Sequence, residues 1–295
     1  MYELCQAAER SYYIDCPAKI GFYRAAENEI YLIDSGSDKD AAKKVKKVLD
    51  ENGWQLRGIL NTHSHADHIG GNHYLQQQTG CKVFSTGIEA DFIRHPVLEP
   101  AFLYGGYPCK ELRHKFLLAQ ESEVSDFADD AFPKEIEIIP LAGHSFGMTG
   151  FRTPDDVVYL ADCLSSRETL DKYGIGFIYD VGAYLETLEA VQHMAAKLFI
   201  PSHTAPAEDI RPLAQYNEQQ VKQIAERIVD LCREPICFED LLARLFQAYQ
   251  LRINFQQYAL VGSTVRSYLA WLKETGRVTV EFDETEKKGV WRADK

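Results

Sequence analysis

Three imidazoles and a carboxylate fall within seven residues, Thr62–His68, directly after a predicted strand. The segment reads Thr-His-Ser-His-Ala-Asp-His. On an extended stretch His63 and His65 point the same way, while Asp67 and His68 follow where the chain turns toward a helix and face a second nearby position. Imidazole nitrogens and carboxylate oxygens suit Zn²⁺, with Fe and Mn as competing ions. The spacing therefore predicts that one loop contributes ligands to two metal ions.

Two metal ions need more ligands than this loop supplies, and later strands offer them. Three further predicted strands are each followed by one candidate ligand, and these ligands are His144, Asp162 and His203. Open α/β architectures gather functional groups just past the ends of their strands. We therefore expect these three side chains to meet the Thr62–His68 loop at one site.

With these motifs in this order, residues from about 10 to 210 resemble the metallo-β-lactamase superfamily. In that family two metals share one site, and the resemblance implies two Zn²⁺ ions here. The residues matching the family's first set of ligands are His63, His65 and His144, and those matching its second set are Asp67, His68 and His203. The residue matching Asp162 bridges both ions. Asp34, at the end of an early strand, matches an aspartate that supports the metal loop without binding metal.

Either Asp162 or Cys163 could be the ligand after this strand, because the two are adjacent and one subclass of family β-lactamases uses a Cys ligand in this region. Neighbouring residues at a strand end point to opposite sides, so only one is expected to reach the metals. We assign Asp162, which completes a two-metal site, and interpret Cys163 as a buried thiol. True β-lactamase activity is then disfavoured, because family β-lactamases usually lack the bridging aspartate.

The resemblance narrows the function to hydrolysis, because the H-x-H-x-D-H form also differs from the H-x-E-x-D pattern of the flavodiiron branch. The expected mechanism uses a hydroxide that bridges the two metals, while one metal polarises a carbonyl or phosphoryl oxygen. Asp67 is assigned as the catalytic base that orients this water, with Asp162 as the alternative acceptor. The sequence names no substrate-binding residue.

Short strands and amphipathic helices alternate through the first two hundred residues, which predicts an α/β fold. The resemblance implies the αββα sandwich of the metallo-β-lactamase family. A helix is expected from Ser37 to Asn52, with Ser37 at its N-terminus. The predicted strands are 29–34, 56–61, 82–85, 135–140, 150–153, 157–160 and 198–200.

Two segments depart from this pattern. Residues from about 91 to 132 carry seven aromatic residues and form an insertion. A lid over the site and a helical excursion packed on the domain or on a second subunit are both open, so a homo-oligomer is one expectation. Residues 213–295 predict three helices and a hairpin, which together suggest a small winged-helix domain after a catalytic domain at 1–212.

The winged helix raises the question of nucleic acid. Residues 214–295 hold 12 Lys and Arg against 12 Asp and Glu, and the candidate recognition helix offers only Arg266 and Lys273 as cations. Packing of the small domain is therefore favoured over groove binding. However, a catalytic domain of this family with a terminal winged helix resembles a branch that includes single-strand ribonucleases, so RNA stays open as a partner.

Composition sets the remaining limits. The formal net charge is −12, which argues against a broad phosphate-binding surface, and no apolar run approaches the length of a membrane span. Seven scattered cysteines without a CxxC pair suit a reducing cytoplasm. The leading prediction is a cytoplasmic zinc hydrolase of a small ester, thioester or lactone. The alternatives are a ribonuclease or phosphodiesterase, and a non-hydrolytic iron protein or DNA-binding regulator.

Overall fold

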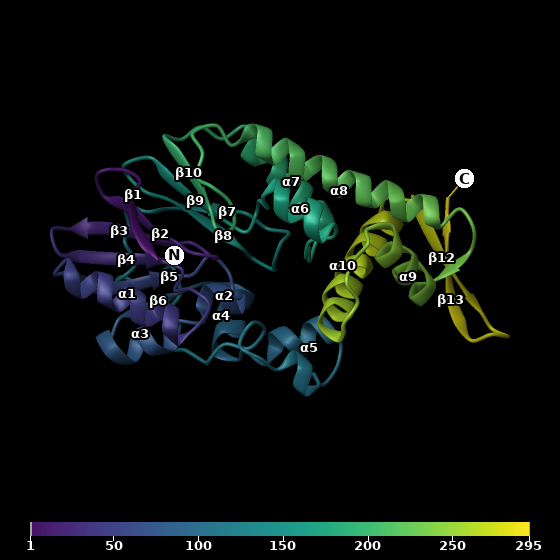
Figure 1. Ribbon diagram of the computed structural model, residues 1–295, viewed down its shortest axis with the longest axis horizontal. Helices are drawn as coiled ribbons and strands as arrows, with labels where there is room; N and C mark the ends of the chain where they lie inside the picture. Colours follow the sequence, from purple (N-terminus) through teal and green to yellow (C-terminus); the bar gives the residue numbers. More distant parts are fainter. Residues whose placement is uncertain (1, 295) are drawn as a thin grey trace.

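Two mixed sheets face each other in the N-terminal part of the molecule (Figure 1). The computed structural model describes residues 2–294. The first sheet has its strands in chain order, namely β1 (Glu3–Gln6), β2 (Ser11–Asp15), β3 (Ile20–Ala26), β4 (Glu29–Ile33), β5 (Gln55–Leu60) and β6 (Lys82–Phe84). The second has the order β10–β9–β8–β7, with bounds β7 (Glu137–Pro140), β8 (Thr149–Arg152), β9 (Val157–Ala161) and β10 (Leu198–Pro201).

Apolar side chains fill the space between the sheets and the space under the helices outside them. Tyr23 and Phe84 from the first sheet pack with Phe151 and Tyr159 from the second. Helices α1 (Lys39–Glu51) and α3 (Asn72–Thr79) lie outside the first sheet, and α6 (Arg167–Tyr173), α7 (Val181–Gln192) and α8 (Arg211–Leu231) lie beside the second (Figure 1). The layers are therefore helix, sheet, sheet, helix, which confirms the predicted αββα sandwich.

Parallel pairing decides where the functional loops lie. Strand β4 pairs in parallel with β5, and β9 pairs in parallel with β10. The carboxyl ends of parallel neighbours reach the same edge of a sheet, so the loops that follow them meet. Asp34 and Thr62 are thus neighbours after β4 and β5, and Asp162 and His203 are neighbours after β9 and β10.

The predicted helix start at Ser37 is wrong by one residue. Helix α1 is capped by Asp38, whose side chain accepts hydrogen bonds from the backbone N–H groups of Asp40 and Ala41. Asp and Ser are both strong N-caps, and the sequence alone offers them side by side. The predicted strands from residue 29 onward all form, with ends shifted by up to two residues, whereas β1, β2 and β3 are absent from the prediction.

The insertion is helical and packs on the C-terminal part of the chain. It contains the second half of α4 (Gly87–Arg94), then α5 (Leu98–Tyr104) and a 3₁₀ helix, η1 (Lys110–Leu112). Leu103 and Leu112 pack against Ala259, and the rings of Tyr104 and Phe255 lie 5.5 Å apart. Figure 1 shows α5 beside one end of helix α10 (Phe255–Glu274). In this structure the insertion packs as a helical excursion on the same chain, and a lid function stays a prediction.

The C-terminal part has the order of elements that a winged helix requires, and that classification stays a prediction. After α8 come β11 (Ile236–Cys237), α9 (Phe238–Ala248), α10, β12 (Val278–Asp283) and β13 (Lys288–Ala293), with the sheet order β11–β13–β12. The predicted boundary at residue 212 falls in the first turn of α8. One apolar core runs across it, because Leu188 and Phe199 belong to the same cluster as Leu245 and Leu269.

None of the helices within residues 2–294 combines the length and apolar character needed to cross a membrane.

Candidate metal centre

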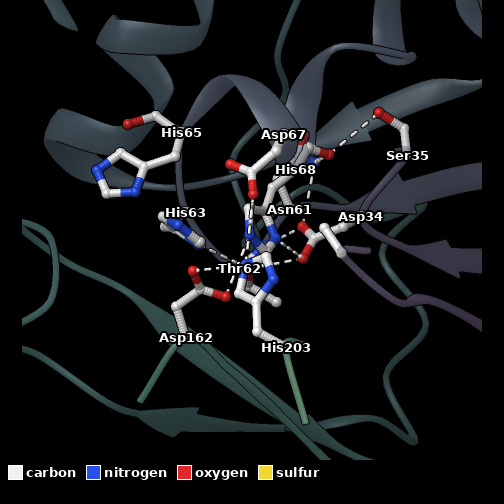
Figure 2. Close-up of polar contacts among 12 residues, drawn as sticks. Asp34, Ser35, Asn61, Thr62, His63, His65, Asp67, His68, Asp162 and His203 are labelled. Atoms are coloured by element: carbon white, nitrogen blue, oxygen red, sulfur yellow. Dashed lines mark hydrogen bonds and ion pairs between the residues drawn. The ribbon is translucent and has the colours of Figure 1, made fainter. Parts of the chain in front are cut away.

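The structure brings all seven predicted metal ligands together at one edge of the two sheets. They come from the loop after β5, from the short helix α2 (Ala66–Ile69) that follows it, and from the segments just after β7, β9 and β10. Three overlapping groups have ligand atoms within 4.8 Å of one another, namely His63–His65–His144, His63–His68–Asp162 and Asp67–His68–His203. Figure 2 shows Asp67, His68, Asp162 and His203 turned toward a shared space.

Asp162 lies between the two halves of this cluster. One half consists of His63, His65 and His144, and the other consists of Asp67, His68 and His203. Its Oδ1 is 3.1 Å from Nε2 of His68, and its Oδ2 is 3.0 Å from Nε2 of His203 and 3.6 Å from Nε2 of His144. A carboxylate that faces imidazoles on both sides can contribute one oxygen to each half. This is the geometry that a bridging ligand requires.

Burial divides the cluster into a floor and a mouth. The side chains of His63 and His68 are fully buried, whereas those of Asp67 and His203 are 35% and 30% exposed. Asp67 Oδ2 lies 3.3 Å from His203 Nε2 at this open side. A substrate would therefore approach past Asp67 and His203.

Three histidines of the cluster are held neutral. Burial lowers the pKa of His65 and of His144 to about 4, and it lowers the pKa of His63 well below its usual range. Nδ1 of His65 and Nε2 of His144 are 3.1 Å apart, which adds mutual repulsion to the cost of charging either ring. Neutral imidazole carries the lone pair that a metal ion needs.

The other half of the cluster is dominated by its carboxylates. Burial alone would lower the pKa of His203, but Asp162 and Asp67 outweigh it and raise the pKa to about 10. Burial alone would raise the pKa of Asp67, but His68 and His203 hold it at about 2. Burial likewise opposes the charge of Asp162, yet His203 and His68 hold its pKa well below the usual range. Both acids are thus ionised at neutral pH, so this half attracts positive charge.

Buried polar atoms without hydrogen-bond partners test whether metal ions fit. Nε2 of His63, Nε2 of His68 and Oδ1 of Asp162 are buried and make no hydrogen bond, even though the last two lie 3.1 Å apart. Unpaired buried polar atoms are costly, so each calls for a reason. The three atoms converge, and nitrogen and oxygen donors in this number suit divalent transition metals. The residues present therefore fit metal ions.

Asp34 lies directly behind the cluster and is 2% exposed. It accepts hydrogen bonds from the backbone N–H and the hydroxyl of Thr62, both at 2.8 Å, and its Oδ2 is 2.8 Å from Nδ1 of His68 (Figure 2). Asp34 itself has the left-handed φ of 62° that Asp tolerates better than most residues. Its carboxylate thus orients His68 and ties the end of β4 to the loop after β5.

Glu89 performs a similar task for the other half, and no sequence pattern identified it. This residue of α4 is 1% exposed. One carboxylate oxygen accepts hydrogen bonds from the N–H and hydroxyl of Ser64, and the other accepts from the hydroxyl of Ser145 and the N–H of Gly147. Glu89 therefore joins the loop of His63 and His65 to the loop of His144. A single Glu on a helix carries no spacing signal, so only tertiary structure reveals this role.

Close backbone packing explains two of the glycines beside the cluster. Gly143 has a φ of +118°, and a Cβ there would lie 2.3 Å from the backbone nitrogen of Tyr184. A Cβ at Gly70 would lie 2.3 Å from the carbonyl oxygen of Ser37. Both positions support the turns that carry the ligands.

Cys163 does not belong to the groups of ligand atoms found among residues 2–294. Its side chain is fully buried in the apolar core with Leu188 and Phe199, and burial raises the pKa of its thiol. Of the other histidines, His73 lies near the Glu121 carbonyl and His193 near the Glu189 carboxylate. None of these three side chains joins the three ligand groups found among the described residues.

Comparison with known proteins gives the family. Residues 14–203 match the model of the metallo-beta-lactamase superfamily. A hydroxyacylglutathione hydrolase of Methylococcus capsulatus is 30% identical over 164 residues, 53% of each chain. One of Rhodobacter capsulatus is 31% identical over 159 residues, 54% of this chain and 51% of the relative. The match thus spans about half the length of these curated relatives.

Solved structures match over nearly the whole chain. A metallo-beta-lactamase family protein of Thermus thermophilus gives a TM-score of 0.71 at 17% identity, covering 97% of this chain and 99% of that protein. A beta-lactamase domain protein of Burkholderia ambifaria gives 0.71 at 15% identity, covering 99% and 94%. At these identities the likeness concerns the fold. With the family model matching residues 14–203, the chain belongs to the metallo-beta-lactamase superfamily.

Proposed function

We propose that this protein is a metal-dependent hydrolase that cleaves a small thioester or ester. The observation that carries the proposal is the convergence of His63, His68 and Asp162, whose buried ligand atoms have no hydrogen-bond partner, at the open site near Asp67 and His203. The relatives at about 30% identity, named hydroxyacylglutathione hydrolases, favour a thioester of a hydroxy acid as the substrate class.

The ligand assignment extends this proposal. His63, His65 and His144 would hold one ion, Asp67, His68 and His203 a second, and Asp162 would contact both. Seven nitrogen and oxygen ligands suit a pair of Zn²⁺ ions, with Fe and Mn as alternatives. Bound there, the ions would lower the pKa of a coordinated water and polarise the oxygen of the substrate's reacting group.

The protein's own residues position the reactants. Asp34 and Glu89 hold the two ligand loops in place through hydrogen bonds, so the ligand side chains are already ordered before substrate binds. Asp67, at the mouth of the site, is placed to accept a hydrogen bond from the attacking water and to aim its oxygen at the substrate. We assign Asp67 this orienting role.

The charges beside the site favour a small substrate over a polyanion. An open groove of about 600 Å³ borders His203 and is lined by Lys19 and Arg167 together with Asp15 and Glu168. Its cations and carboxylates balance, and a phosphate backbone needs an excess of cations. In α10, the Arg266 guanidinium lies over the ring of Phe238, 4.0 Å from its centre. That packing reduces its value for binding nucleic acid.

A parallel assay of zinc-loaded protein tests the function. The substrates are a hydroxyacyl thioester of glutathione, a lactone, a chromogenic phosphodiester and labelled single-stranded RNA, each with metal-stripped protein alongside. We expect metal to raise thioester or ester cleavage by about a hundredfold or more, with little effect on the phosphodiester or RNA.

The His63→Ala variant provides the control, because it removes a buried ligand, and it should abolish the metal-dependent rate. Cleavage of RNA alone would replace the proposal with the ribonuclease alternative. Absence of any metal-dependent cleavage would contradict the hydrolase assignment.

A further inference from the structure

A largely enclosed cavity lies beside the candidate metal centre, where the C-terminal helices cover the second sheet. His144, Asp162 and His203 form one wall of the cavity. Further walls come from α8, α10 and the segment 176–178 that precedes α7. A group bound at the metal cluster could therefore extend directly into the cavity.

The cavity is small and mainly apolar. Its volume is about 60 Å³. Measured in the same way, a site for one water has a volume of about 10–15 Å³. The cavity therefore has room for a chain of about four or five non-hydrogen atoms. Apolar side chains that line it include Leu164, Leu170, Phe177, Val221 and Ile224. This lining suits a short acyl chain.

Tyr268 places one unpaired polar atom in this lining. The side chain belongs to α10 and is fully buried, and its hydroxyl makes no hydrogen bond. Burial raises the pKa of Tyr268 well above its usual range, so the phenol is neutral and can donate a hydrogen bond at any working pH. An unpaired buried hydroxyl is unfavourable unless a bound molecule supplies its partner.

Two other polar side chains of the lining, Tyr184 and Asn217, already have partners. Tyr184 donates its hydroxyl to the carbonyl of Cys163 at 2.9 Å. Asn217 uses its side-chain oxygen on Ser165 N–H and its nitrogen on the carbonyls of Ser165 and Leu213. Of the two tyrosine hydroxyls in the lining, that of Tyr268 is therefore the one available to a ligand.

The charges around the cavity define the ligand further. Among the described residues that line it there is no Lys or Arg, and the acid present is Asp162 of the metal cluster. Apart from the histidines of the metal cluster, the described lining offers no counter-charge to a carboxylate or phosphate on the buried end of a ligand, and burying such a charge would be costly. The ligand group must therefore be uncharged, short, and able to form one hydrogen bond with the Tyr268 hydroxyl.

We propose that this cavity receives the acyl chain of the substrate and that Tyr268 selects chains carrying an uncharged hydroxyl or carbonyl substituent. The inference rests on the proposed hydrolase function, because the acyl carbon must lie at the metal cluster for its chain to enter the cavity. Tyr268 is thus a specificity-determining residue that the C-terminal part of the chain contributes to the site.

Thioesters of a single thiol with matched acyl chains test this. Acyl groups with a hydroxyl on the second, third or fourth carbon are compared with isosteres that carry a methyl group instead. We expect the zinc-loaded wild type to prefer at least one hydroxyacyl chain over its isostere by about tenfold or more in kcat/KM. Tyr268→Phe should remove that preference and leave the isostere's rate within about twofold.

Tyr184→Phe is the matched control, because its hydroxyl is already bonded to Cys163, and it should keep the wild-type preference even if the protein becomes less stable. A preference that survives in Tyr268→Phe would overturn the proposal, as would a wild type that treats hydroxyacyl chains and isosteres alike. In that case Tyr268 would bond a buried water only.

A binding measurement separates this proposal from the hydrolase assignment. Unreactive thioethers with hydroxyalkyl or isosteric alkyl chains are titrated into zinc-loaded wild type and Tyr268→Phe by calorimetry. A hydroxyl preference of about tenfold in Kd that disappears in Tyr268→Phe supports the cavity assignment even if no thioester is cleaved. Equal Kd values for both probes in the wild type overturn it.

Discussion

His68 connects the support of the site to its chemistry. Its Nδ1 faces Asp34 at 2.8 Å and its Nε2 faces Asp162 at 3.1 Å, so the two ring nitrogens have separate tasks. A carboxylate behind a histidine fixes the orientation of the ring and strengthens the forward nitrogen as a ligand. His203 has the same arrangement with a weaker partner, because its Nδ1 lies 2.7 Å from the Pro17 carbonyl.

Glu99 is a buried acid near the metal loop. The side chain lies on α5 and is 6% exposed. Burial, together with the charge of Asp67, raises the pKa of Glu99 well above its usual range. The folded state therefore retains a proton that the unfolded state releases, and stability falls as pH rises above the ordinary pKa of Glu.

Replacing Glu99 by Gln should remove this pH dependence. We expect Glu99→Gln to raise the Tm of metal-stripped protein at pH 7 to 8 relative to wild type, and the gap to close as pH falls below about 4.5, where both states are protonated. Thermal melts across about pH 4 to 8 measure this. Glu121→Gln, at an exposed position of the same insertion, is the control and should melt like wild type. A gap that is independent of pH would contradict the assignment.

The candidate ligands were the most predictable part of the molecule. The spacing of His63, His65, Asp67 and His68 carries the chemistry in the sequence itself, and the structure brings them together with the later ligands. Glu89 and Tyr268 could not be predicted in this way. Their roles depend on contacts with residues 25 or more positions away or on a cavity between helices, and neither leaves a local pattern.

Helix α4 controls the distance between two ligand loops through Glu89. The Glu89 carboxylate accepts four hydrogen bonds, two from Ser64 and one each from Ser145 and Gly147. Removing it leaves buried donors unpaired and frees the His144 loop from the His63 loop. The effect should fall on the metal site rather than on the rest of the fold.

We expect Glu89→Ala to weaken metal affinity by about tenfold to a hundredfold, as loss of a supporting partner does at other metal sites. Glu89→Gln keeps the shape of the side chain and one acceptor oxygen, so it should restore only part of the affinity, whereas a purely steric role would predict full restoration. Competition with a chromophoric chelator measures the affinity. Asp91→Ala, an exposed acid on the same helix, is the control and should bind metal like wild type. Wild-type affinity in Glu89→Ala would contradict the positioning role.

Strands were easier to predict where turn-forming residues mark their ends. The pair β8 and β9 is joined by Pro154-Asp155-Asp156, and their predicted ends differ from the structure by one residue at most. Strands β1 to β3 were missed, although aromatic runs such as Ser11–Asp15 are typical of strands. They form an antiparallel meander in which β1 pairs with β2, β2 with β3 and β3 with β4, and the alternating strand and helix pattern further on does not indicate such a meander.

At the scale of the whole molecule, the C-terminal part, residues 213–294, packs against the rest of the chain and lines the cavity beside the metal cluster. It shares an apolar core with the second sheet, meets the insertion at α5 and provides Tyr268 to the cavity beside the metal cluster. The order of its helices and strands was predictable from sequence periodicity. The cavity was not, because it arises only where α8 and α10 pack against the segment before α7.

The central claim is that the seven converging ligands hold metal ions on which hydrolysis depends. The most direct test is a zinc titration of metal-stripped protein, with bound zinc and thioester hydrolysis measured on the same samples. His63→Ala and the exposed His193→Ala serve as the matched pair of variants. We expect no hydrolysis without metal, a rise to full activity by two zinc ions per chain, loss of activity in His63→Ala and wild-type behaviour in His193→Ala. Full activity in stripped protein, or in His63→Ala, would contradict the claim.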